Sequence, residues 1–77
     1  MILKQIGFNG NVIKRMAADE VNVYNECFSI IRDGKIKSYF SASMPATVLY
    51  FVVTCGKIKI KYVPDRLNNT WGVIMEE

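Results

Sequence analysis

Residues 27–40 read CFSIIRDGKIKSYF and give the clearest structural signal in the chain. Two runs rich in β-branched and aromatic residues flank the pair Asp33-Gly34, and both residues of this pair accept a positive φ angle. The combination predicts a β-hairpin with a two-residue turn. Its expected inward face consists of cross-strand pairs that are small or apolar: Ile31 with Ile36, Ser29 with Ser38, and Cys27 with Phe40.

Further turn signals predict more hairpins on either side. Asn9-Gly10 and Cys55-Gly56 each lie between two apolar runs, and a closing strand carries Trp71, which we expect as a core residue or else as an interface anchor. The expected strands are 2–8, 11–16, 21–32, 35–41, 47–54, 57–63 and 71–75. The predicted fold is therefore mainly β: a small single domain over residues 1–77, an antiparallel barrel or sandwich of about six strands built from hairpins.

The segment before Gly56 also fits a helix. Ser43 would cap this helix, Pro45 would lie in its first turn, and Gly56 would end it. The alternative fold is then α+β, with one helix near residues 44–55. The β-branched residues of this segment favour a strand instead, and they are Thr47, Val48, Val52, Val53 and Thr54.

The composition argues against catalysis. The 77 residues contain no histidine, which removes the commonest general base and metal ligand. Cys27 and Cys55 form no C-x-x-C pair, and we expect two buried thiols. The adjacent acids Asp19 and Glu20 are not the separated carboxylates of a hydrolase. We therefore expect no enzyme, no catalytic residue, no metal site and no cofactor.

The most unusual predicted surface combines lysines with aromatic rings. Six of the ten basic residues lie between residues 32 and 61, beside a single acid, Asp33. In the hairpins around Asp33-Gly34 and Cys55-Gly56, strand alternation places them on outward faces. In the first hairpin this outward face would also hold Phe28 and Ile30. The candidate binding residues are Lys35, Lys37, Tyr39, Tyr50, Lys57, Lys59 and Lys61, and we expect them to share one sheet surface.

Such a surface supports several functions. Lysines attract phosphates or acidic proteins, and exposed rings stack on bases or anchor protein interfaces. The first hypothesis is a non-enzymatic module that binds a protein partner, as an inhibitor, adaptor or subunit. Phages and mobile elements often carry such short chains against host defence, as anti-CRISPR-type inhibitors, although no residue here points to that role. The alternatives are a nucleic-acid-binding small β-barrel and an obligate homo-oligomer, and a solvated strand face explains the same pattern.

The sequence also suggests a compartment. Lys4 and Gln5 interrupt the N-terminal apolar run that a signal peptide needs, so we expect no secretion. The longest apolar run covers residues 48–53, which is too short for a membrane-spanning helix. The expected location is the cytoplasm, without a membrane partner.

Overall fold

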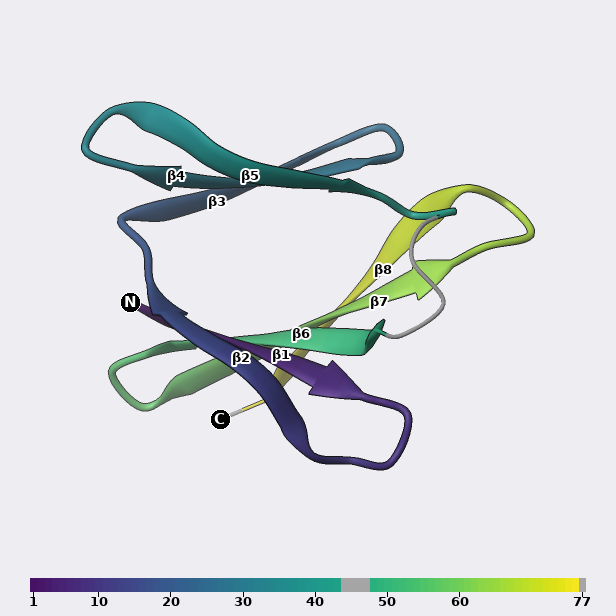
Figure 1. The fold of residues 1–77 in the computed structure, drawn as a ribbon, viewed down its shortest axis with the longest axis horizontal. Coiled ribbons are helices and arrows are strands. Elements are labelled where there is room, and N and C mark those ends of the chain that lie inside the picture. The colour runs from purple at the N-terminus through teal and green to yellow at the C-terminus, as the bar shows by residue number, and fades with distance from the viewer. Residues whose placement is uncertain (44–47, 77) are drawn as a thin grey trace.

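The computed structural model describes residues 1–43 and 48–76, and these residues form eight β-strands (Figure 1). The strands are β1 (Ile2–Gly7), β2 (Val12–Ala17), β3 (Glu20–Tyr24), β4 (Cys27–Arg32), β5 (Lys35–Ser41), β6 (Val48–Cys55), β7 (Ile58–Asp65) and β8 (Thr70–Glu76). They make a five-stranded sheet in the order β2-β1-β6-β7-β8 and a three-stranded sheet in the order β3-β4-β5. Every pairing is antiparallel.

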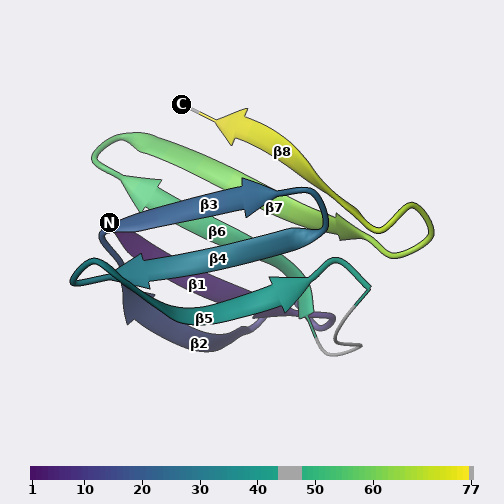
Figure 2. The same ribbon diagram turned by 90° about the horizontal axis from the view of Figure 1, so that it is seen from above.

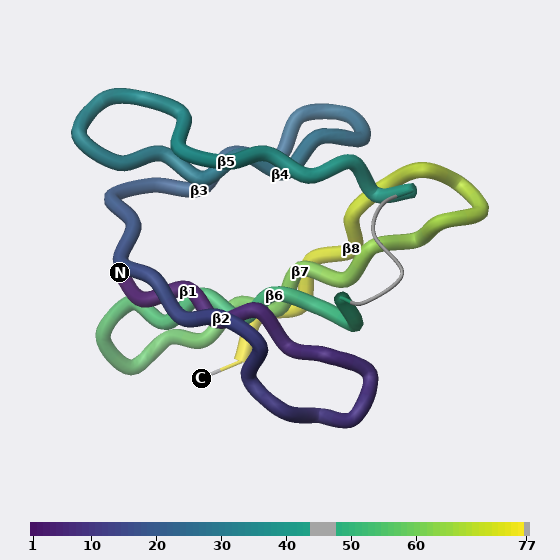
Figure 3. The backbone as a smooth tube through the Cα atoms, in the orientation of Figure 1, coloured from purple at the N-terminus to yellow at the C-terminus, as the bar shows by residue number. Residues whose placement is uncertain are grey.

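The prediction of a mainly β, antiparallel fold built from hairpins is confirmed. The two sheets lie as two layers, one above the other (Figure 1). Figure 3 shows the chain passing from β2 to the other layer close to the N-terminus. At this crossing the main chains of Met1 and Ala18 exchange two hydrogen bonds of 3.0 Å each. The alternative helix is wrong for residues 48–55, which form a strand, and residues 44–47 lie outside the described residues.

The predicted turns are present, and the structure adds one that the sequence analysis missed. Asp33 and Gly34 both have positive φ angles, as a two-residue turn requires, whereas in the first turn Gly10 has a positive φ and Asn9 does not. The expected strand 21–32 is instead a hairpin, because Asn25 adopts a φ of 54° and Tyr24 pairs with Cys27. Eight strands form where about six were expected, partly for this reason.

The predicted faces of the second hairpin are wrong for β4 and for Ile36, and right for β5 beyond its bulge. Ile31 pairs with Ile36 as expected, but a bulge follows, and Phe28 then pairs with Phe40 instead of Cys27. A one-residue slip moves side chains to the opposite face of a strand. Here it brings Phe28 and Ile30 to the inner face beside Phe40, which was expected there, and they are buried at 0% and 1% exposure. Burying these larger side chains stabilises the bulged register.

The third hairpin keeps its predicted faces in a different register. Its turn consists of Gly56 and Lys57, because Cys55 pairs with Ile58 and Val53 with Ile60. A two-residue turn at Cys55-Gly56 predicts a core face in which Val53 pairs with Ile58, Phe51 with Ile60 and Leu49 with Tyr62. The observed register differs from this by two residues, so no side chain changes face. One exception is Leu49, which was expected in the core and is exposed, while its neighbour Val48 is buried beside a bulge.

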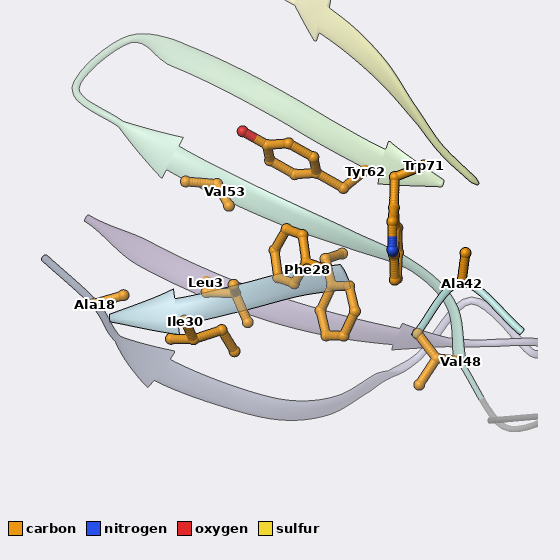
Figure 4. Close-up of a cluster of buried hydrophobic side chains, with 10 residues drawn as sticks. Leu3, Ala18, Phe28, Ile30, Ala42, Val48, Val53, Tyr62 and Trp71 are labelled. Carbon is orange, nitrogen blue, oxygen red and sulfur yellow. The ribbon is translucent and has the colours of Figure 1, made fainter. Parts of the chain in front are cut away.

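Aromatic residues from both sheets form the centre of the core. The rings of Phe28 in β4 and Phe51 in β6 stack at 4.7 Å and 4°. Tyr62 and Trp71 lie against Phe28 at 4.9 Å and 5.2 Å. Figure 4 shows Phe28 surrounded by side chains from several strands. Trp71 is 8% exposed, which confirms it as a core residue.

Two smaller expectations are also resolved. Cys27 is partly buried and Cys55 is exposed, so the expectation of two buried thiols is wrong; both are free. Cys55 lies at the end of β6, where the three-stranded sheet no longer covers it. Across residues 1–43 and 48–76 there is no helix long and apolar enough to cross a membrane.

Candidate functional site

The seven predicted binding residues do not share one surface. Lys35, Lys37 and Tyr39 belong to β5 in the three-stranded sheet, whereas the other four belong to the β6–β7 hairpin of the five-stranded sheet. The sheets pack through their inner faces, so their outer faces point in opposite directions (Figure 1). The expected common platform is therefore wrong, because each hairpin covers the core with its own inner face.

A row of cations crosses the outer face of the five-stranded sheet. Lys4 in β1 lies opposite Arg15 in β2, and two strands away Lys61 in β7 occupies the same level, with Val52 between them. Two strand spacings separate Lys4 from Lys61 by about 10 Å. We refer to Arg15, Lys4 and Lys61 as the cationic row. Like charges placed opposite one another destabilise a sheet, and an anion at this surface would relieve that repulsion.

Tyr50 is the aromatic residue nearest to this row, and Lys61 covers it. The Lys61 ammonium lies 4.8 Å from the centre of the Tyr50 ring and 3.5 Å from a carboxylate oxygen of Glu76. Lys59 lies on the same face and is exposed, while Lys57 lies in the adjacent turn. The Tyr50 ring, on which a nucleic-acid base would stack, is thus already in contact with the Lys61 ammonium of the protein itself.

Lys4 and Arg15 were not among the predicted binding residues, although the sequence contains a signal for their pairing. A two-residue turn at Asn9-Gly10 places Lys4 opposite Arg15, which is the pairing observed. No local signal predicts that Lys4 and Arg15 lie beside Lys61. That position depends on the pairing of β1 with β6, which are more than forty residues apart in the chain.

The outer face of the three-stranded sheet has a different character. Tyr24 and Tyr39 are 74% and 72% exposed, and Ile36 is 61% exposed. We call this surface the tyrosine face, and its residues are Asn22, Tyr24, Cys27, Ser29, Ile31, Ile36, Tyr39 and Ser41. None of these eight is a lysine, arginine, aspartate or glutamate, and Glu20, on the same side of β3, lies at the edge of the face.

Two charged residues, Glu20 and Lys37, lie at the Ile31–Ile36 end of the tyrosine face. Glu20 pairs with Ile31, and Lys37 is the extra residue of the bulge beside Ile36. Tyr24 was missed as a candidate because the turn at Asn25 was not recognised, so residues 21–32 were read as a single strand. Tyr39 is exposed as predicted, but among neutral residues rather than lysines.

The described residues contain no group of three histidine, cysteine, aspartate or glutamate side chains that could hold a metal ion. They also include no buried polar or charged side chain. The two outer faces differ in character: one carries the cationic row, and the other is aromatic and hydroxyl-bearing.

Comparison of the chain with protein-family models, with curated proteins and with solved structures gives no match in any of the three.

Proposed function

We propose that the chain is a non-enzymatic binding module that contacts a protein partner through the tyrosine face. The supporting observation is the exposure of Tyr24 and Tyr39, at 74% and 72%, on a neutral sheet surface. A solvated strand face has no need of two large rings that remain in water. Inhibitors, adaptors and subunits all use surfaces of this type.

The composition of the tyrosine face supports a protein partner. Tyrosine supplies a large contact area with little loss of conformational freedom, and serine and asparagine supply adaptable hydrogen bonds. Asn22, Ser29 and Tyr39 lie side by side across the three strands and combine these roles. Charged side chains are depleted at the centre of protein interfaces, as they are here.

Photo-crosslinking tests this proposal. A photoreactive amino acid replaces Ile36, which is exposed beside Tyr39, and the chain is expressed in its native cells. We expect a discrete crosslinked protein, and we expect its loss in the double variant Tyr24→Ser, Tyr39→Ser. Both tyrosines are exposed, so the double variant should keep the thermal unfolding transition of the parent.

A matched control places the photoreactive group at Lys59, on the opposite face of the molecule. The proposal requires that the protein captured at position 36 is not captured at position 59. The same band from both positions, or a band that persists without the two tyrosines, contradicts it.

A second candidate function, nucleic-acid binding, is favoured by the cationic row. Three cations at one level across a sheet could follow a phosphate backbone. The three contacts would give a log–log salt slope of about −2 for a single strand. Fluorescence anisotropy with a labelled oligonucleotide measures this slope. Lys4→Glu should abolish binding, whereas Lys35→Glu on the other layer should not, and the absence of binding at low salt excludes this function.

We place the protein in the cytoplasm as part of the same proposal. Both thiols, Cys27 and Cys55, are free, as is usual in a reducing compartment. Labelling with a maleimide immediately after lysis of native cells should modify the exposed Cys55. A Cys55 that is already oxidised in those cells would contradict this location.

A further inference from the structure

β8 is an unprotected edge of the five-stranded sheet. It pairs with β7 through seven consecutive residue pairs without a bulge, and no other described strand pairs with its second edge. The unpaired edge of a regular strand presents main-chain N–H and C=O groups that another strand can bind. β8 therefore offers a regular template of seven residues.

The other edge strands carry features that discourage such pairing. β2 contains Lys14 and Arg15 and has a register shift beside it. β5 contains Lys35 and Lys37 and has the bulge described above. β3 is the shortest of the eight strands and alternates polar with apolar residues. β8 has no lysine, arginine or proline, and its one charged residue is Glu76 at its end.

An uncovered apolar surface accompanies this edge. Seen from above, β8 lies beyond the area covered by the three-stranded sheet (Figure 2). Val73 and Met75, on the same side of β8 as the core residue Trp71, are 54% and 66% exposed. Ile74 on the other side is 51% exposed, and Ile58 of β7 is 40% exposed. A partner strand at this edge would cover the apolar side chains on both sides of β8.

We propose that β8 pairs antiparallel with β8 of a second copy of this chain, forming a two-fold symmetric dimer with one continuous sheet. The inference is independent of the tyrosine face, which lies on the other layer. Pairing β8 with β8 consumes the unprotected edge of both copies, so the assembly closes at two. Pairing β8 with β2 of a second copy would leave β8 of that copy unpaired and would bring β8 against Lys14 and Arg15.

The residues of β8 are complementary to themselves in this arrangement. With the two-fold axis at Val73, the two Val73 side chains meet and Met75 lies opposite Trp71 of the second copy. Ile74 then lies opposite Gly72 of the second copy. A Cβ atom on Gly72 would meet just one atom within 4 Å, the Val63 carbonyl oxygen at 3.7 Å, so there is room for the isoleucine.

The charge on β8 also selects the antiparallel direction. In an antiparallel pair the two Glu76 carboxylates lie at opposite ends of the interface, each opposite Thr70. A parallel pair would place them at the same end, where like charges repel. The continuous sheet would contain ten strands, five from each copy.

Light scattering over a range of protein concentrations tests the proposal. We expect the wild type to reach twice the chain mass of 8.8 kDa and to go no higher. Val73→Lys puts two like charges at the symmetry axis and should give a monomer with an unchanged far-UV circular dichroism spectrum. The control is Ile36→Lys, an apolar-to-lysine change of similar exposure on the β5 edge, which should remain dimeric.

Disulfide crosslinking tests the register separately from stability. In a chain with Cys27 and Cys55 replaced by serine, Val73→Cys should crosslink rapidly to a dimer on mild oxidation, and Ile36→Cys should not. A wild type that is monomeric at all concentrations overturns the proposal. So does a dimer that survives Val73→Lys, or a mass that keeps growing with concentration.

Discussion

The indole Nε1 of Trp71 donates a 2.8 Å hydrogen bond to the main-chain carbonyl of Glu26. Glu26 lies in the turn between β3 and β4, and Trp71 lies in β8, so the bond joins the two sheets. The same carbonyl accepts a second hydrogen bond, of 2.9 Å, from the amide of Ala42. The turn that the sequence analysis missed is therefore one of the points that hold the layers together.

Trp71→Phe should destabilise the protein by about 1–3 kcal/mol, because it removes this hydrogen bond and part of a buried side chain. Denaturant unfolding measures the change. Glu26→Ala is the control, since it keeps the main-chain carbonyl and removes only the side-chain contact with Asn69. Its cost should stay below about 1 kcal/mol. Equal losses in the two variants would show that the indole bond contributes little.

Phe28→Ala should cost about 3–5 kcal/mol, because Phe28 is fully buried and stacks on Phe51. A domain of this length has roughly 4–12 kcal/mol of stability in total, so the variant should lose a large part of it and unfold at a much lower denaturant concentration. Leu67→Ala, at a side chain 97% exposed, should leave the unfolding midpoint unchanged. An unaltered midpoint for Phe28→Ala would mean that the two sheets do not pack through this ring.

Gly56→Ala and Gly72→Ala should have different effects. Gly56 has a φ of 62°, and a Cβ atom there would meet no atom within 4 Å, so alanine costs about 1 kcal/mol through the backbone alone. Gly72 has no positive φ and has space for a methyl group within one chain, so in the monomeric Val73→Lys background alanine should be neutral or stabilise by about 0.5 kcal/mol. Thermal unfolding compares the two. A loss at Gly72 equal to that at Gly56 would contradict this account.

Tyr62 should make stability fall at alkaline pH. Burial raises the pKa of its hydroxyl above the ordinary value of 10.0, so the unfolded chain loses the proton first as pH increases. The stability that comes from the protonated Tyr62 hydroxyl is fully present below pH 10.0 and decreases as the pH rises toward the folded pKa. Unfolding free energies across this range should fall less steeply for Tyr62→Phe than for the wild type. Parallel curves would rule out a role for this hydroxyl.

The hairpins could be predicted because their signals are local. Asp33-Gly34 and Asn9-Gly10 tolerate positive φ angles, and the apolar runs around them have strand composition. The signal at Asn25 was weaker, since asparagine followed by glutamate is a less distinctive turn than asparagine followed by glycine. The β6 strand was correctly favoured over a helix for residues 48–54 because its residues are largely β-branched.

The candidate site was only partly predictable for a different reason. The lysines and Tyr50 of the third hairpin lie on its outer face as expected, because a shift of two residues preserves strand alternation. The prediction for the second hairpin failed because a single bulge in β5 puts the opposite side of β4 in the core. The position of the bulge depends on which side chains can be buried against the five-stranded sheet. Phe28 is buried because it stacks on Phe51 of that sheet.

The sequence by itself determined the strands, most of their turns and the excess of positive charge in the middle of the chain. These properties follow from backbone preferences and alternation over a few residues. Only the tertiary structure decided which faces meet in the core, that Lys4 and Arg15 lie beside Lys61, and that β8 remains uncovered. Those outcomes depend on strand pairings and layer packing between distant segments, where the burial of apolar area is shared by the whole domain.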